Sequence, residues 1–186
     1  MAAPRVGFTP SRNPSIGFVG NYPAAASDNQ SIAKGDAVAL LNGTIVPCTA
    51  GQDPSLRGWG VVLAVYTTAN RPLTNQTTKI IASAGTGRVD VVWDPNQTYY
   101  VQCETSVGLS NIGKNVVLAV SAANATTGLS GEFLQIPASA SLNDLFKITN
   151  IGPFDELSGK GTGGGTNNGV EVVWNYHQLK ATTAGQ

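Results

Sequence analysis

The run Lys34-Gly-Asp-Ala-Val-Ala-Leu-Leu-Asn-Gly-Thr-Ile-Val-Pro-Cys48 predicts a β-hairpin closed by a two-residue turn. Asn42 and Gly43 tolerate the positive φ angles that a type I′ turn requires, and apolar residues flank them on both sides. The strands Ala37–Leu41 and Thr44–Cys48 should therefore pair antiparallel. This hairpin indicates a β protein before any other part of the chain is considered.

The short turn also predicts the register of the hairpin. Leu40 should face Ile45 and Val38 should face Pro47, because a two-residue turn pairs the flanking residues in order. Leu40, Ile45 and Val38 then share one face, which we expect to be buried. In this register the N–H that Pro47 lacks would point away from its partner strand, so the proline is tolerated.

The rest of the chain predicts short strands separated by turn residues. Each predicted strand is rich in β-branched, aromatic or other apolar residues, with Gly, Pro, Asn or Asp between the strands. After the hairpin the predicted strands are Gly58–Tyr66, Lys79–Ala82, Arg88–Trp93, Thr98–Glu104, Asn115–Val120, Phe133–Ile136, Phe146–Ile151 and Gly169–Leu179. This pattern predicts an all-β barrel or sandwich of about 8 to 10 short, mostly antiparallel strands.

Residues 1–33 show neither a helical nor a two-residue period, so we predict an extended N-terminal arm there. Residues 34–186 are predicted to form a single β domain with a glycine-rich loop at 159–169. Large apolar residues in an irregular segment need a dry surface, either on their own domain or on a neighbouring subunit. The candidate contact residues in the arm are Phe8, Ile16, Phe18 and Tyr22.

Charged residues are scarce in this chain. They make up 12% of the sequence, with eleven basic and eleven acidic side chains. Binding to phosphates needs clustered Lys and Arg, so we expect no nucleic-acid partner. A surface so poor in charge suits either a stable β protein coated with Thr and Asn or a protein that lies against other subunits.

Neither a signal peptide nor a membrane-spanning run is apparent in the sequence. We therefore expect a chain that is made in the cytoplasm and spans no membrane. Cys48 and Cys103 are far apart and lack CxxC spacing, which favours two buried thiols over a zinc site.

Residues that could carry chemistry lack suitable partners in the sequence. His177 is the only histidine, and its neighbours on the same face of the predicted strand, Asn175 and Leu179, offer it no obvious catalytic partner. Gly159-Lys-Gly-Thr-Gly-Gly164 matches GxGxxG but lacks the strand before it and the helix after it that phosphate binding requires. We therefore predict no catalytic residue, metal or cofactor. One alternative stays open, a carboxylate pair drawn from Asp90, Asp94, Glu104 and Glu171.

Three runs within residues 34–65 carry a family resemblance. They are Gly35-Asp36-Ala37-Val38, Pro47-Cys48-Thr49-Ala50-Gly51 and Gly58-Trp59-Gly60-Val61-Val62-Leu63. Together they resemble the start of the small head decoration, or capsid cement, proteins of tailed phages. Members of that family are β-rich proteins that bind the outside of an icosahedral shell, commonly as trimers, and stabilise it without catalysis.

The resemblance implies a virion structural protein on the capsid exterior, not an enzyme. Its implied partners are the major capsid protein and further copies of this chain, with a trimer favoured. The alternative is a carbohydrate- or receptor-binding β module of a phage fibre or tail. That alternative requires two or more of Trp59, Trp93 and Trp174 to be exposed and coplanar.

Overall fold

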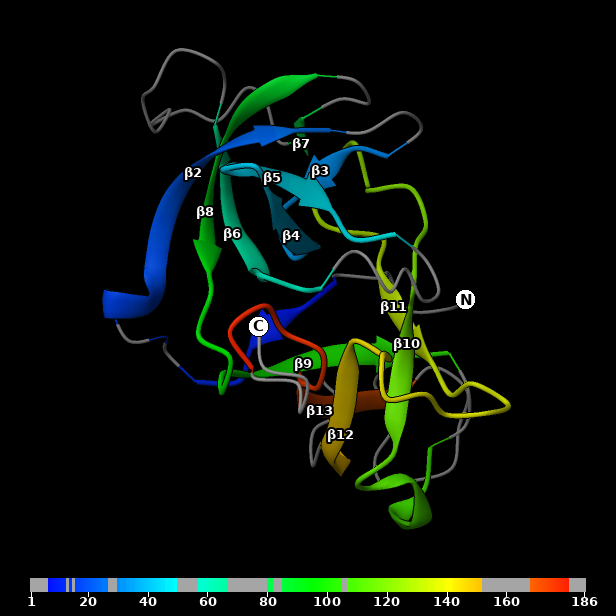
Figure 1. The fold of residues 1–186 in the computed structure, drawn as a ribbon. Coiled ribbons are helices and arrows are strands. Elements are labelled where there is room, and N and C mark those ends of the chain that lie inside the picture. The colour runs from blue at the N-terminus through cyan, green and yellow to red at the C-terminus, as the bar shows by residue number, and fades with distance from the viewer. Residues whose placement is uncertain are drawn as a thin grey trace.

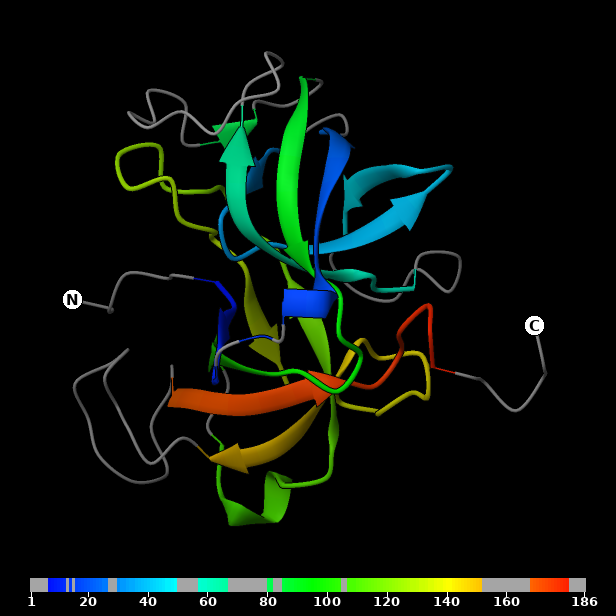
Figure 2. The same cartoon turned by 90° about the vertical axis from the view of Figure 1, so that its left-hand side faces the viewer.

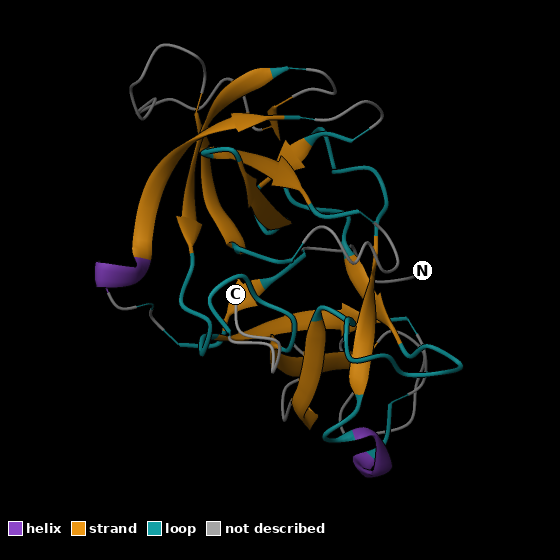
Figure 3. Ribbon diagram, in the orientation of Figure 1, coloured by secondary structure: helices purple, strands orange, loops and turns teal. Residues whose placement is uncertain are grey.

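The structure, a computed structural model, describes residues 7–12, 14, 16–26, 30–49, 57–66, 80–81, 85–104, 107–151 and 168–180. Within these residues the chain folds into short strands and two 3-10 turns, η1 (Ile16–Phe18) and η2 (Leu109–Asn111). The predicted all-β class is therefore confirmed. Figure 3 shows that strands and connecting loops dominate the molecule.

Five strands form a closed barrel in the first half of the chain, in the order β2-β5-β4-β6-β8. Their bounds are β2 (Val19–Ala25), β4 (Ala37–Leu41), β5 (Thr44–Pro47), β6 (Gly60–Tyr66) and β8 (Thr86–Val92). Only β2 and β5 pair in parallel; the other pairs are antiparallel. A short antiparallel pair, β3 (Ile32–Ala33) with β7 (Ile80–Ile81), lies beside this barrel (Figure 1).

The predicted hairpin is confirmed, with Leu40 opposite Ile45 and Val38 opposite Pro47. Asn42 and Gly43 have φ angles of 50° and 80°, as the turn requires. Val38 and Ile45 are fully buried in the core of the first barrel, and Leu40 packs against that core. The hydrophobic pattern therefore predicted the inner face of the hairpin.

Five later strands form a second ring: β9 (Thr98–Cys103), β10 (Asn115–Ala119), β11 (Phe133–Gln135), β12 (Phe146–Ile151) and β13 (Asn168–Trp174). They pair in the order β9-β11-β10-β12-β13, and β13 pairs back onto β9 and closes the ring. The short strand β1 (Thr9–Pro10) adds to β9 beside β11. Figure 2 shows the second ring directly below the first barrel.

One core runs from the second ring into the outer face of the first barrel. Ala37, Ala39 and Cys48 alternate with the inner residues of the hairpin and are also buried. They belong to the same apolar cluster as Trp174 and Phe146 of the second ring. The hairpin is consequently buried on both faces, which its alternating pattern did not predict.

The arm predicted for residues 1–33 needs correction over the part that the structure describes. β1 pairs with β9, and β2 pairs with β8 along its whole length. Proline within β2 is tolerated because this strand makes only a single residue pair with β5 on its other edge. The strands β1 and β2 thus pair with later strands of the same chain, and the fold does not divide at residue 33. Most of the glycine-rich loop predicted at 159–169 lies outside the described residues, and β13 begins at Asn168.

Substitution of Phe8 tests this correction. Phe8 is 2% exposed, and its ring stacks on Phe146 with a centroid distance of 4.5 Å. We expect Phe8→Ala to lower the free energy of unfolding by about 3 to 5 kcal/mol, measured by urea denaturation. Phe18→Ala, at a half-buried position, should cost clearly less. Equal, small losses for both variants would contradict the placement of Phe8 in the core.

Candidate functional site

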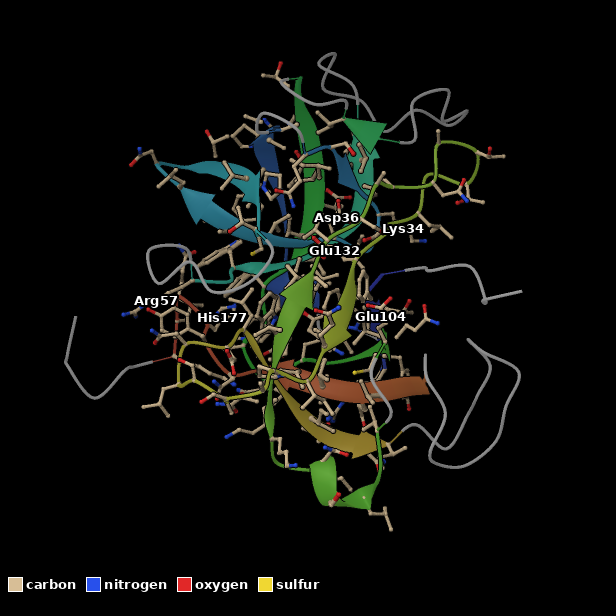
Figure 4. All side chains as sticks on the ribbon, turned by 90° about the vertical axis from the view of Figure 1, so that its right-hand side faces the viewer. Lys34, Asp36, Arg57, Glu104, Glu132 and His177 are labelled. Atoms are coloured by element: carbon tan, nitrogen blue, oxygen red, sulfur yellow. The ribbon has the colours of Figure 1, made fainter. Side chains whose placement is uncertain are left out.

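Three deeply buried ionisable side chains lie where the two barrels meet. Asp36, Glu132 and His177 are 5%, 2% and 1% exposed. In Figure 4, Asp36 and Glu132 lie close together between the barrels, and His177 lies to one side of them with Arg57. This junction is the candidate functional site.

Asp36 sits in a tight turn that leads from β3 into β4. Gly35 has a φ of 92°, a backbone conformation that glycine adopts at little cost, and its N–H donates to the carbonyl of Val62. The Asp36 carboxylate then accepts the N–H of Ala33 at 2.6 Å. The sequence Lys-Gly-Asp therefore supplies both the turn and the acid that closes it.

The second ring contributes Glu132 through the segment that leads into β11. The Ser130 N–H donates to the carbonyl of Lys34 at 2.9 Å, which ties this segment to the first barrel. The Ser130 hydroxyl bonds the Asp36 carboxyl and also accepts the Glu132 N–H. Glu132 Oε2 accepts the N–H of Ala37 at 2.7 Å. Each of the two acids thus receives a main-chain N–H from this region, Asp36 from β3 and Glu132 from the start of β4.

Burial governs the protonation of these acids. Loss of solvent raises the pKa of Asp36 to about 6, against the opposing effect of its hydrogen bonds from Ser130 and Ala33. For Glu132, burial and then the charge of Asp36 raise the pKa well above its usual value. Burial likewise raises the pKa of the Cys48 thiol, and the two nearby acids add to the effect.

A pocket of about 230 Å³ opens beside the two acids. Its walls come from Gln30, Ser31 and residues 120–123, together with Asp36 and Glu132. The lining carries a few hydroxyl and amide groups but no basic side chain. Among the described residues, no three His, Cys, Asp or Glu side chains are placed to hold a metal ion. The two acids can bind and release protons, and their carboxyl groups accept hydrogen bonds from main-chain N–H groups.

His177 occupies a different side of the junction. After β13 the chain turns back, and His177 pairs with Gly58 just before β6. The imidazole Nδ1 accepts the N–H of Leu179 at 3.0 Å, so the ring proton must sit on Nε2, which donates to the carbonyl of Trp59 at 2.6 Å. Burial lowers the pKa of His177 to about 4, and the hydrogen bond to Trp59 only partly offsets that effect.

Aromatic rings connect the two cores through this histidine. His177 stacks on Trp59 at a centroid distance of 6.1 Å and meets Trp174 edge-on at 5.5 Å. Trp59 in turn stacks on Trp93 at 5.7 Å. Trp174 stacks on Phe146 at 4.2 Å. The imidazole therefore bridges an aromatic pair of the first barrel and the aromatic core of the second ring.

The candidate contact residues from the sequence fall in different environments. Phe8 lies in the core, so its predicted role as a contact to another subunit is corrected. Phe18 and Tyr22 are half-buried and meet Trp93 and Trp59 edge-on. The backbone of Ile16 forms part of η1, but its side chain lies outside the described residues.

Sequence reasoning missed the acid pair at the junction. The carboxylate pair left open was drawn from other acids, and Asp90, for example, binds Asn21 and Tyr66 instead. Glu132 gives one usable signal, because it is the only charged residue between Lys114 and Lys147 apart from Asp144. A lone acid beside an apolar strand in a chain so poor in charge is a candidate for burial with hydrogen-bond partners.

Comparison with protein-family models finds no match for this chain, and no curated protein matches it either. In the described part of the chain, no helix has the length and apolar character needed to cross a membrane.

The protonation state of His177 can be measured directly, because it is the only histidine. We expect its NMR signals to titrate near pH 4 and to report the Nε2–H tautomer at neutral pH. The unfolded chain takes up this proton near pH 6.5 and the folded chain only near pH 4, so stability from this group is lost as the pH falls through that interval. A titration midpoint near 6.5, or the Nδ1–H tautomer, would contradict the proposed geometry.

Gly58 tests how closely the barrels approach at the histidine. A Cβ added to Gly58 would lie 2.0 Å from the Trp174 ring. We expect Gly58→Ala to lower the free energy of unfolding by about 1 to 3 kcal/mol in urea denaturation, because the indole must move. Gly108→Ala is the matched control, since a Cβ there meets nothing within 4 Å. Equal stabilities of the two variants would show that the junction is looser than described.

Proposed function

We propose that the protein is a virion structural protein, a capsid decoration or cement protein that binds the outer surface of an icosahedral phage head. The proposal begins with the resemblance carried by residues 34–65. The described part of that segment contains β4, β5 and β6, which are neighbouring strands of the first barrel. The residues behind the resemblance therefore include three strands of a barrel, which is compatible with the β-rich family that they resemble.

The observation that carries the proposal is how the buried polar groups are used. Asp36, Glu132 and His177 all bind main-chain groups. Two of these bonds, from Ala37 to Glu132 and from His177 to Trp59, join parts of the chain that are distant in sequence. Such groups stabilise a rigid two-barrel body. A rigid binder loses little conformational entropy when it docks, which suits a protein whose function is to hold other subunits in place.

The proposed contact surfaces are two projecting corners of the molecule. At η2, Leu109 is 80% and Ile112 is 42% exposed. At η1, the half-buried Phe18 is followed by Val19, which is 37% exposed. Figure 1 shows these turns at well-separated ends, η1 beside β2 and η2 below β10. Two separated contacts on one rigid body would bridge neighbouring capsid subunits, and the second contact would form at high effective concentration.

Binding to phage heads tests the proposal. Heads of the encoding phage, prepared without this protein, are mixed with the purified chain and examined by co-sedimentation and electron microscopy. We expect regular decoration of the shell. The double variant Leu109→Ser/Ile112→Ser should bind at least about tenfold more weakly, equivalent to about 1.4 kcal/mol. Its melting temperature should be close to that of the wild type, because both side chains are exposed.

Leu41→Ser is the matched control, since Leu41 is 49% exposed at the hairpin, away from both corners. It should bind like the wild type. Failure of the wild-type chain to bind the heads would overturn the proposed function. If Leu41→Ser weakened binding to the heads as much as the double variant does, η2 would not be a specific part of the contact surface.

The alternative sugar-binding function finds less support. Trp174 is fully buried, and the rings of Trp59 and Trp93 stack on each other. A sugar platform needs free ring faces, and this pair uses one face of each ring internally.

A further inference from the structure

Two carboxyl groups from different barrels meet at the pocket without a cation between them. In the part of the chain that the structure describes, neither Asp36 nor Glu132 has an ion-pair partner. Their hydrogen bonds come from Ala33, Ala37 and Ser130, which are all neutral donors. Neutral donors favour one negative charge at this site but cannot cancel two.

The other ionisable groups nearby do not neutralise the charge of the Asp36–Glu132 pair. Lys34 precedes the turn and is exposed, so solvent screens its charge. The thiol of Cys48 is buried and neutral, because burial and the two acids raise its pKa. Residues 120–123 line the pocket, and the segment 120–131 contains no ionisable side chain. Asp36 and Glu132 therefore determine the charge of this side of the junction.

We propose that Asp36 and Glu132 act as a proton-dependent clasp, which keeps the two barrels together at the pocket only while the pair retains at least one proton. With one proton, the pair carries a single negative charge that the surrounding N–H and hydroxyl groups satisfy. When the last proton leaves, two like charges face each other in a site with little solvent, and their repulsion is strong.

Loss of the proton opens the junction on the pocket side alone. The bonds that break are those of the 129–132 segment to the β3–β4 turn, including the bond between Ser130 and Lys34. The His177 side stays closed, because its imidazole is neutral at both neutral and alkaline pH. Water that enters the pocket then solvates the two carboxylates.

The expected pH range follows from the direction of the shifts. Unfolded Asp and Glu lose their protons near pH 3.8 and 4.5, but the folded pair holds them to higher pH. The stability that the clasp provides is therefore full at low pH and is lost as the pH rises through the folded values. Well above pH 6.5 His177 is neutral in both the folded and the unfolded chain, so it no longer contributes to the pH dependence there.

Thiol labelling of the full-length chain tests the clasp. Cys48 is 1% exposed beside the pair, and Cys103 is fully buried in the second ring. Labelling is followed by mass spectrometry between pH 6.5 and 9, and each rate is divided by that of the same cysteine in the unfolded chain. We expect the corrected rate at Cys48 to rise at least about tenfold, while the rate at Cys103 stays constant. Charge-removing variants Glu132→Gln and Asp36→Asn should each abolish the rise.

Glu104→Gln provides the matched control, because it removes an acid from the second ring at a site hydrogen-bonded to Gln135. It should keep the wild-type rise at Cys48. The two clasp variants serve as independent tests should one of them fail to fold. A flat Cys48 rate in the wild type, a rise that persists in the clasp variants, or a parallel rise at Cys103 would each overturn the proposal.

Discussion

The two-sided burial of β4 is the constraint on which the rest of the structure depends. Val38 faces the core of the first barrel, while Ala37 and Ala39 face the core shared with the second ring. Small side chains on the second face allow the second ring to approach closely. The same strand begins at Ala37, whose N–H binds Glu132. One strand thus determines the spacing of the two barrels and supplies one of the polar bonds between them.

Burial acts with opposite sign at the two polar parts of the junction. Around Asp36 and Glu132 it favours the protonated acid, and around His177 it favours the deprotonated imidazole. In both cases the favoured form is the one with less charge. The hydrogen bonds at His177 also favour the neutral imidazole, because Nδ1 accepts the N–H of Leu179 and so cannot carry a proton of its own. The junction is built to be nearly neutral, as the low dielectric of its surroundings requires.

Local patterns predicted much of the fold. Asn42-Gly43 predicted the turn and register of the hairpin, and most later strands begin or end within two residues of their predicted bounds. The closure of both sheets could not be predicted, because strand order depends on contacts between distant residues. β2 was missed because Gly20, Asn21 and Pro23 interrupt any two-residue pattern. Of the candidate site, sequence analysis noted His177 and overlooked Glu132, whose significance depends on its burial.

The closure of the two sheets bears on how this chain limits aggregation through the edges of its strands. An open sheet presents unpaired N–H and C=O groups along its edge, to which another chain can add a strand and start aggregation. Proteins commonly prevent this with charged side chains, which are scarce here. Ring closure gives the long strands partners on both sides, and the strands outside the rings, β1, β3 and β7, have only two residues each. Closure of the sheets thus protects this chain from aggregation, although it has few charged side chains to repel other copies.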